Sequence, residues 1–301
     1  MSVIMNSAQI TSLLKRGVKK VWGTEDDYAP EWPHIYKTEM SDKDVEPIIE
    51  YKPTGLMEVK QEGGPTTYDS AQEAYRINVQ HTELSLGFIV TERAKEDNLY
   101  EREFPRQVEM LKKSARETKE RLAMSIFNNA LNPLFPLGDG LPLLSTNRPL
   151  IAGGTYSNTL PVQADLQETT VEQAIILMGK MKDQAGNVRK VLPKKILVGV
   201  NNMFNIKRIT KSEYTPSSAN NPRNIINLEN IFPEVVVSHY MVPQNSWMIL
   251  SDQQGFVHFQ RRPLRHSIYQ DFDTDNHKYK VTERYSFVCY NPRAVVGCFL
   301  T

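Results

Sequence analysis

Cysteine is scarce in this chain, and the usual marks of export are missing. Only Cys289 and Cys298 occur among 301 residues, too few for a disulfide framework or a four-cysteine zinc site. The chain has no Asn-x-Ser/Thr glycosylation site, and no run of about 18 apolar residues suits a transmembrane helix. We expect two free, buried thiols, kept apart by a hairpin turning at 291–293, in a protein that is not secreted.

An excess of charge of either sign is also missing. The 36 lysines and arginines nearly balance the 35 aspartates and glutamates, which leaves a net charge of +1. A protein that coats nucleic acid usually carries a strong basic excess, so this balance argues against a nucleic-acid-binding module. It also leaves little long-range repulsion between copies of the chain, which favours self-association.

Sequence motifs of catalysis are missing as well. The chain has no GxxxxGKS/T, GxSxG, HExxH or CxxC motif, and its six histidines show no ligand pairing at i, i+2 or i, i+4. We therefore predict no catalytic, cofactor-binding or metal-binding residue.

One cluster of carboxylates offers an alternative. Asp271, Asp273 and Asp275 alternate as at the start of a calcium loop, but Asn276 and Thr282 stand where that loop needs Gly and Glu. A solvated turn is the favoured interpretation. A metal-dependent hydrolase that uses the three aspartates is the alternative.

The first third of the chain reads as an arm followed by extended structure. Residues 1–33 predict one short amphipathic helix that prolines end. Residues 54–61 and 75–90 predict two strands of a hairpin, and the apolar parity changes near Thr82, which indicates a bulge or bend. The hairpin tip is poor in apolar residues, and an isolated hairpin is marginal in water.

The rest of the chain predicts a long helix and then an α+β region. Residues 106–131 are typical of a helix with a narrow apolar stripe and many charges. Later predicted elements are a helix opened by a capping box at Thr169–Glu172 and ended near Gly186, a helix at 202–211, and strands at 195–200, 234–239, 247–251, 255–260, 278–290 and 294–300. In the strand at 278–290, alternate residues from Tyr279 to Cys289 share one face.

Arm, hairpin and long helix each bury little surface by themselves. A chain that docks them on identical neighbours gains buried area and ion pairs, and such heterologous contacts close into rings or shells. These features alone still leave an enzyme open as an alternative.

An ordered series of segments resembles a known family. The chain is similar to the major capsid proteins of tailed double-stranded DNA phages, in the branch of the Mu-like major head subunit. The resemblance runs from about Phe127 to Gly297. The segments that carry it are FNNALNPLFPLGDGLPLLSTNRPL with GGTYSNTL, PKKILVGVNNMFNIKRITKSE, NIINLENIFPEVVVSHYM, WMILSD, RRPLR and FDTDNHKYKVTERYSFVCYNPRAVVG.

The resemblance implies the family's α+β fold, with an N-terminal arm, an E-loop hairpin, a long spine helix, a P-domain and an A-domain. The implied segments are residues 1–33 for the arm, 34–92 for the E-loop region, 93–160 for the P-domain with its spine helix, 161–243 for the A-domain and 244–301 for the C-terminal strands of the P-domain.

The implied function is structural rather than enzymatic. The resemblance implies a virion protein without cofactors, assembled in the host cytoplasm, whose hexamers and pentamers form an icosahedral head around double-stranded DNA. It also implies a separate scaffolding protein, a portal, and a head protease or decoration protein as partners. No sequence-specific DNA contact and no membrane are implied.

We expect weak, repeated contacts between copies to hold such a shell. The candidate assembly residues come from three places: the E-loop, the basic patch near the C-terminus and an A-domain loop. They are Glu58, Lys60, Glu62, Arg261, Arg262, Arg265, Tyr214 and Asn220.

Overall fold

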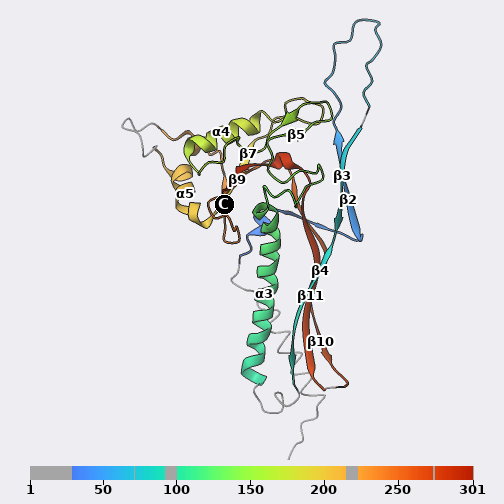
Figure 1. The fold of residues 1–301 in the computed structure, drawn as a ribbon, viewed down its shortest axis with the longest axis vertical. Helices are drawn as coiled ribbons and strands as arrows, with labels where there is room; N and C mark the ends of the chain where they lie inside the picture. The colour runs from blue at the N-terminus through green and yellow to red at the C-terminus, as the bar shows by residue number, and fades with distance from the viewer. Residues whose placement is uncertain (1–28, 71, 92–99, 215–222, 274, 301) are drawn as a thin grey trace, which may run out of the picture. The chain divides into compact units, whose positions relative to one another are not determined.

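The computed structural model describes residues 29–70, 72–91, 100–214, 223–273 and 275–300. Helices and strands are mixed along the described chain, so the fold is α+β, as the sequence predicts (Figure 1). The helices and 3-10 turns are η1 (Trp32–His34), α3 (Tyr100–Asn128), α4 (Glu168–Gly179), η2 (Val200–Asn202), α5 (Met203–Lys211), α6 (Ile225–Leu228) and η3 (Pro292–Ala294). The short helix predicted within 1–33 lies almost wholly outside the described residues.

The strands pair into sheets of mixed sequence order. Among the described residues, one sheet has the order β1-β10-β11-β4, a second has the order β12-β9-β7-β8, and β2–β3 and β5–β6 form two-stranded pairs. The strands are β1 (Lys37–Met40), β2 (Val45–Lys52), β3 (Gln72–Gln80), β4 (Thr82–Val90), β5 (Arg148–Pro149), β6 (Thr155–Tyr156), β7 (Pro193–Gly199), β8 (Glu234–Ser238), β9 (Trp247–Ser251), β10 (Phe256–Gln270), β11 (His277–Cys289) and β12 (Val295–Cys298).

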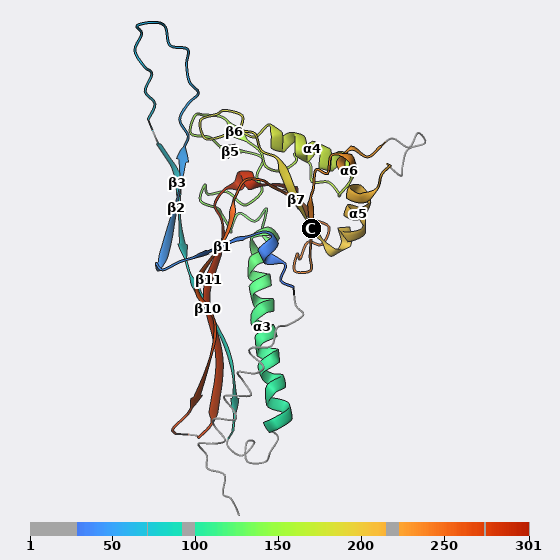
Figure 2. The same ribbon diagram turned by 180° about the vertical axis from the view of Figure 1, so that it is seen from behind.

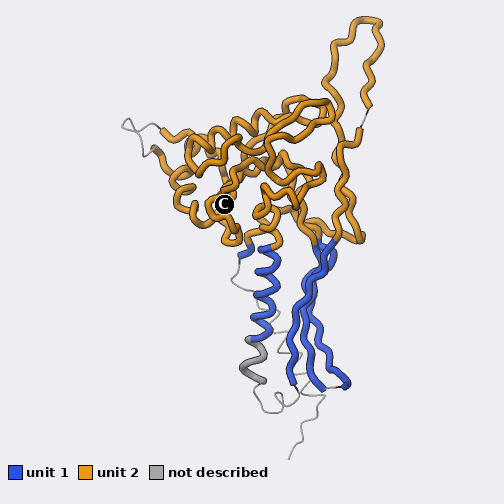
Figure 3. The backbone as a smooth tube through the Cα atoms, viewed as in Figure 1, with its two compact units in different colours: residues 1–30, 81–121, 260–285 blue, residues 31–80, 122–259, 286–301 orange. Residues whose placement is uncertain are grey.

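The chain divides into two units, each assembled from stretches that are distant in sequence (Figure 3). The smaller unit takes residues 1–30, 81–121 and 260–285, and the larger unit takes 31–80, 122–259 and 286–301. The boundary falls within α3, β10 and β11, so these three elements contribute residues to both units.

The smaller unit is built on a twisted pair of long strands. Residues 82–90 of β4 pair antiparallel with residues 277–285 of β11. The buried row of β11 in this unit alternates, as the sequence predicts: Tyr279, Val281, Glu283 and Tyr285. Phe88 stacks on Tyr279 with ring centroids 5.0 Å apart. The break between β3 and β4 falls at His81, next to the predicted bend.

The part of α3 in this unit runs alongside the same strands in both ribbon views (Figures 1 and 2). Val108 and Leu111 are buried. Lys119 Nζ lies 2.6 Å from Glu283 Oε1 and 4.7 Å from the centre of the Tyr285 ring. A mostly buried ion pair therefore joins the helix to the sheet. Glu283 lies in an otherwise apolar row of β11, and Lys119 supplies the opposite charge that a buried carboxylate needs.

The larger unit contains the sheet β12-β9-β7-β8 with α4, α5 and α6. Strand β7 pairs parallel with β8 and antiparallel with β9, and Ile196 and Val198 of β7 are completely buried. Trp247 is completely buried and donates from Nε1 to the carbonyl of Ala164 at 3.0 Å. This core gathers the apolar side of α4, with Val171, Ala174 and Met178.

A second core in the same unit is aromatic. Tyr36, Phe127, Phe256 and Phe287 form edge and stacked contacts with centroid distances between 4.8 and 6.3 Å. The Tyr36 hydroxyl donates to the carbonyl of Ala123 at 2.6 Å, so its polar atom is satisfied inside the core. Burial raises the pKa of Tyr36 well above its usual value.

Several predicted boundaries are wrong for local reasons. The first hairpin strand is Val45–Lys52, not 54–61, because Ile48 packs on a small core with Val79 and Phe259, whereas Leu56 to Lys60 are exposed. The N-cap of α4 is Gln167, two residues before the predicted N-cap Thr169, and Gln167 and Thr170 form the reciprocal cap.

The predicted end of α4 is also wrong. The helix ends at Gly179, and Gly186 instead lies at φ +85° in a tight turn. In that turn Asp183 Oδ1 accepts from the backbone N–H groups of Ala185 and Asn187, both at 2.9 Å. Gly186 is used because a left-handed conformation is strained for a residue with a side chain.

The two cysteines are free and buried, as predicted, but the C-terminal hairpin is not formed. Strand β12 pairs antiparallel with β9 rather than with β11. Cys289 lies in the aromatic core and Cys298 in the core around Trp247. Within the described residues, no helix has both the length and the apolar character that crossing a bilayer requires.

Gly87 offers a test of the β4–β11 pairing. A Cβ built at Gly87 would overlap the carbonyl oxygen of Tyr279, whereas one built at Gly179 in α4 meets nothing within 4 Å. We expect Gly87→Ala to destabilise the unassembled subunit by about 1–3 kcal/mol, measured as free energy of unfolding in urea. Gly179→Ala is the control and should leave stability unchanged or slightly higher. Equal stability of the two variants would contradict the pairing.

Candidate functional site

The three E-loop candidates lie in the long loop between β2 and β3. Glu58, Lys60 and Glu62 are all exposed there. The loop ties its own two sides together, because Thr67 Oγ1 donates to Glu58 Oε2 at 3.1 Å and Lys60 Nζ donates to Thr66 Oγ1 at 3.4 Å. Nearer the stem, the backbone N–H of Gly55 donates to Asp69 Oδ2 at 2.7 Å. The charges are thus presented to the solvent on a ribbon whose two sides are joined by polar contacts.

The same loop exposes apolar side chains that the sequence analysis did not single out. Leu56, Met57, Val59 and Tyr68 are 78%, 101%, 98% and 91% exposed. A cluster of large apolar residues without cover is typical of an interaction surface. The segment LMEVK (residues 56–60) does alternate apolar and charged residues at its end. We interpreted this alternation as a paired strand, which hid the exposed apolar surface.

The stem of this hairpin, in contrast, is firmly held within the larger unit. Arg293 donates from Nε to the carbonyl of Lys182 at 2.8 Å and from a terminal nitrogen to Glu50 Oε1 at 3.2 Å, and it stacks over Tyr156 at 4.7 Å. Burial raises the pKa of Glu50, and Arg293 partly offsets this rise. A rigid stem therefore carries the exposed loop.

Tyr75 adds a second anchor to the stem. Its hydroxyl donates to the carbonyl of Tyr290 at 3.1 Å, and burial raises its pKa. Gly138 packs directly against Tyr75 and Ile77. A Cβ at position 138 would lie 2.7 Å from a ring carbon of Tyr75 and 2.3 Å from a side-chain carbon of Ile77. The glycine is required by this close approach of the chain to the stem.

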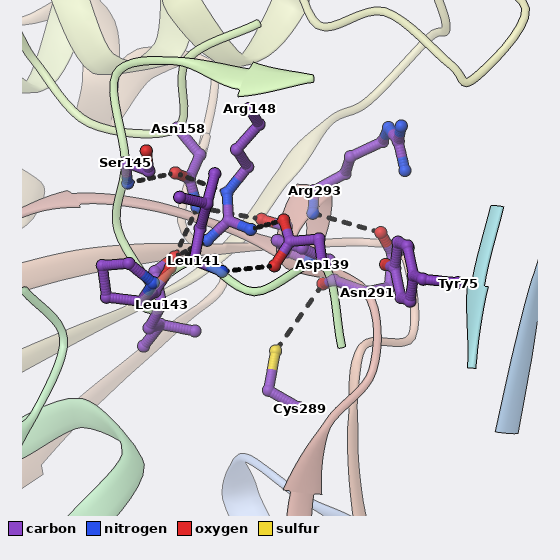
Figure 4. Close-up of polar contacts among 12 residues, drawn as sticks. Tyr75, Asp139, Leu141, Leu143, Ser145, Arg148, Asn158, Cys289, Asn291 and Arg293 are labelled. Carbon is purple, nitrogen blue, oxygen red and sulfur yellow. Dashed lines mark hydrogen bonds and ion pairs between the residues drawn. The ribbon is translucent and has the colours of Figure 1, made fainter. Parts of the chain in front are cut away.

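Beside the stem lies a buried arginine that the sequence analysis also missed (Figure 4). Arg148 has no exposed surface and forms an ion pair with Asp139. It also donates to the carbonyls of Pro142 and Leu143 and, at 3.2 Å, to Asn158 Oδ1. Every donor group is directed at an acceptor of the loop itself, so the arrangement is structural.

Asn158 extends this network to the C-terminal strands. Its side-chain nitrogen donates to the carbonyls of Leu143 at 2.8 Å and Pro292 at 3.2 Å, and its oxygen accepts from the backbone N–H of Ser145 at 2.9 Å. The segment around 139–158 contains only the two-residue strands β5 and β6, and these hydrogen bonds make it a fixed part of the larger unit.

The basic candidates lie on β10. Arg262 forms an ion pair with Glu83 of β4, so this arginine is already engaged within its own unit. Arg265 is exposed and Arg261 half-buried. The E-loop candidates belong to the larger unit and these arginines to the smaller one.

Of the two A-domain candidates, only Tyr214 is among the described residues. Tyr214 is 46% exposed and forms an isolated antiparallel bridge with Arg223. Asn220 lies outside the described residues. The predicted site is therefore a set of separate surfaces, and the structure does not test whether they contact another copy.

The three aspartates of the alternative hydrolase are at the turn between β10 and β11. Asp271 Oδ2 accepts from Lys278 Nζ at 2.7 Å, which makes it an ion-pair partner. Among the described residues, no group of three or more His, Cys, Asp or Glu side chains could hold a metal ion. Burial raises the pKa of Cys289 to about 12, which disfavours a thiolate nucleophile.

The Arg148 network yields a stability test. We expect Arg148→Met to lower the free energy of unfolding by about 3–5 kcal/mol, because Asp139 would remain as an uncompensated charge. Arg189→Met is the matched control, since Arg189 also pairs with an aspartate, Asp183, but is 52% exposed, and it should cost less than about 1 kcal/mol. Urea unfolding of both variants provides the measurement, and similar costs would refute the assignment.

Three solved structures with a similar fold come from capsids or a virus-like particle. A chain of the mature capsid of bacteriophage PhiM1 is 12% identical, with a TM-score of 0.57 over 92% of this chain and 89% of that chain. The capsid of cyanophage P-SCSP1u is 8% identical, with a TM-score of 0.57 over 93% and 91%. A virus-like particle from Pyrococcus furiosus is 11% identical, with a TM-score of 0.50 over 97% and 98%. At these identities the likeness concerns the fold.

The sequence itself matches a family. No protein among the curated ones matches the chain. The family model described as phage capsid protein matches residues 75–297, nearly three quarters of the chain. The expected fold is thereby confirmed, and the enzyme alternative is not supported. The chain belongs to the phage capsid protein family and is a structural protein of the virion, the subunit from which the phage head is built.

Proposed function

We propose that this chain is the major capsid protein of a tailed phage in the Mu-like branch, and that its copies form the hexamers and pentamers of an icosahedral head around double-stranded DNA. The family match and the capsid fold support the shell. The ordered segments from about Phe127 to Gly297 support the branch. The single observation that carries self-assembly is the exposed apolar loop on an anchored stem.

The proposal assigns the segments of the chain to the domains that the resemblance implies. Residues 1–33 are assigned to the N-terminal arm, 34–92 to the E-loop region, 93–160 to the spine helix and its part of the P-domain, 161–243 to the A-domain and 244–301 to the C-terminal P-domain strands. In support, β2, β3 and their loop lie in the second segment, α3 in the third, and α4, α5 and α6 in the fourth.

In this proposal the loop between β2 and β3 lies on a neighbouring copy. Leu56, Met57 and Val59 lose contact with water there, and fully burying such side chains contributes about 1.5–3 kcal/mol each. Glu58, Lys60 and Glu62 set the orientation through charge pairs of about 0–1 kcal/mol each. Arg261, Arg262, Arg265, Tyr214 and Asn220 are proposed for further contacts between copies.

Other components of the head follow from the same proposal. A separate scaffolding protein directs assembly in the host cytoplasm, and a portal occupies one vertex. A head protease that trims subunits, or a decoration protein that binds the shell, is a further partner. The DNA is enclosed without sequence-specific contact, which agrees with the net charge of +1.

Electron microscopy of the purified, concentrated protein tests this function. We expect rings, tubes or closed shells. A protein that stays a monodisperse 34.5 kDa particle at all salt concentrations would contradict it.

The loop variant Met57→Ser/Val59→Ser tests the contact. Loss of two buried apolar side chains should raise the subunit concentration required for assembly by at least about tenfold. Gln61→Ser, an exposed polar position in the same loop, is the control and should assemble normally. Since both apolar side chains are exposed in the subunit, the thermal midpoint should not change. Assembly of the double variant at the normal concentration would refute the loop as an interface.

A further inference from the structure

The connection between α4 and β7 concentrates positive charge in a chain that is nearly neutral as a whole (Figure 1). Residues 179–195 contain six lysines and arginines but a single acidic residue, Asp183. All of these residues belong to the larger unit. Four of the lysines are exposed, and we call them the lysine turn: Lys180, Lys182, Lys190 and Lys194.

The carboxylates near the lysine turn are already engaged with other groups. Asp183 Oδ2 accepts from Arg189 Nε at 2.9 Å, and its Oδ1 accepts from two backbone N–H groups of the same turn. Glu234 Oε2 lies 2.8 Å from the nitrogen of Lys195, the sixth cation. Among the described residues, none of the four lysine-turn side chains forms an ion pair. Four positive charges on one short connection therefore lack a balancing carboxylate.

The backbone that carries these charges is held in one conformation. Lys182 and Val188 form an antiparallel bridge, and the N–H of Arg189 donates to the carbonyl of Met181, whose side chain is buried, at 3.0 Å. The Arg293 side chain donates to the carbonyl of Lys182 at 2.8 Å. The lysines are thus kept near one another despite the repulsion between like charges, and an anionic partner would relieve that repulsion. A surface arranged in advance also loses less conformational freedom on binding.

We propose that the lysine turn binds the phosphate backbone of duplex DNA, namely the DNA that the proposed head encloses. This inference rests on the proposed function and assigns the residues through which the subunit contacts the DNA. A lysine ammonium is a point charge with three donors, so it binds phosphate oxygens without reading the bases. Each such contact releases a condensed counterion from the duplex, which is the source of the affinity.

A second copy of the chain fits the lysine turn less well than DNA does. In the loop between β2 and β3, Glu58 and Glu62 flank Lys60, and at the turn after β10 Asp271 is paired with Lys278. Each of these acidic surfaces would bring a cation toward the lysine turn together with its carboxylates. Duplex DNA instead presents one negative charge per about 1.7 Å of helix axis and carries no fixed cation.

Duplex binding by the unassembled subunit tests the proposal. Fluorescence anisotropy of a labelled duplex is measured between about 50 and 200 mM salt, at a subunit concentration below the onset of assembly. We expect Kd to rise with salt concentration. Lys182→Gln/Lys190→Gln should raise Kd by at least about tenfold at the lowest salt and reduce the slope of log Kd against log salt by about 2. Lys180→Gln/Lys194→Gln should have the same effect.

Lys43→Gln/Lys113→Gln is the matched control. It removes the same charge from two lysines that are 67% and 77% exposed, but each of these already pairs with a glutamate. Its Kd should stay within about threefold of that of the unmodified protein. Because all the substituted lysines are exposed, the thermal midpoints should not change.

The other outcomes overturn the proposal. If the unmodified subunit binds no duplex at the lowest salt, or if the control weakens binding as much as the lysine-turn variants, the DNA contact is refuted. Particle formation by electron microscopy is a separate readout, so the proposed function stands or falls independently. If the variants bind DNA normally but require a higher subunit concentration for assembly, the turn contacts an acidic protein surface instead, with the exposed Val188 and Leu192 as its apolar part.

Discussion

Two buried arginines hold together the part of the molecule from which the hairpin extends. Arg148 and Arg293 are almost without exposed surface. Arg148 pairs with Asp139 and donates to the carbonyls of Pro142 and Leu143, and Arg293 pairs with Glu50 and donates to the carbonyl of Lys182. A buried guanidinium is strongly destabilising without an opposite charge nearby, so each arginine needs the chain around it to keep its carboxylate in place. The turn η3, the segment 139–158 and the base of β2–β3 are held in place by these contacts.

That rigidity matters because the loop beyond it has no packing of its own. Met57 and Val59 are as exposed as in an extended chain, yet the strands that carry the loop are anchored through Glu50 and Tyr75. A docking element on a fixed stem loses less conformational freedom on association than a loose one, which leaves more of the burial free energy for the contact. In the proposed shell this saving would apply at every copy, because the same loop is present in each subunit.

Charges of opposite sign are separated along the chain although the net charge is small. The chain as a whole is nearly neutral, but β10 carries arginines and the following turn carries aspartates. A near-neutral net charge creates little long-range repulsion between copies of the chain. The inner pair of Lys119 and Glu283 differs in kind, because it is mostly buried and joins α3 to the sheet within one unit.

The sequence by itself determined the α+β class, the long helix, most strands of the C-terminal half and the two buried thiols, because periodicity and apolar runs report local burial. The strand predicted at 255–260 is wrong at its end, because β10 continues to Gln270. The family resemblance added the function, and the family match confirmed it. Tertiary structure alone decided which segments pair: β12 joins β9 rather than β11, and β2 forms at 45–52 rather than 54–61. It also decided that Arg148 and Arg293 are buried, since an arginine in a loop looks solvated until the carbonyls that surround it are brought together from distant parts of the chain.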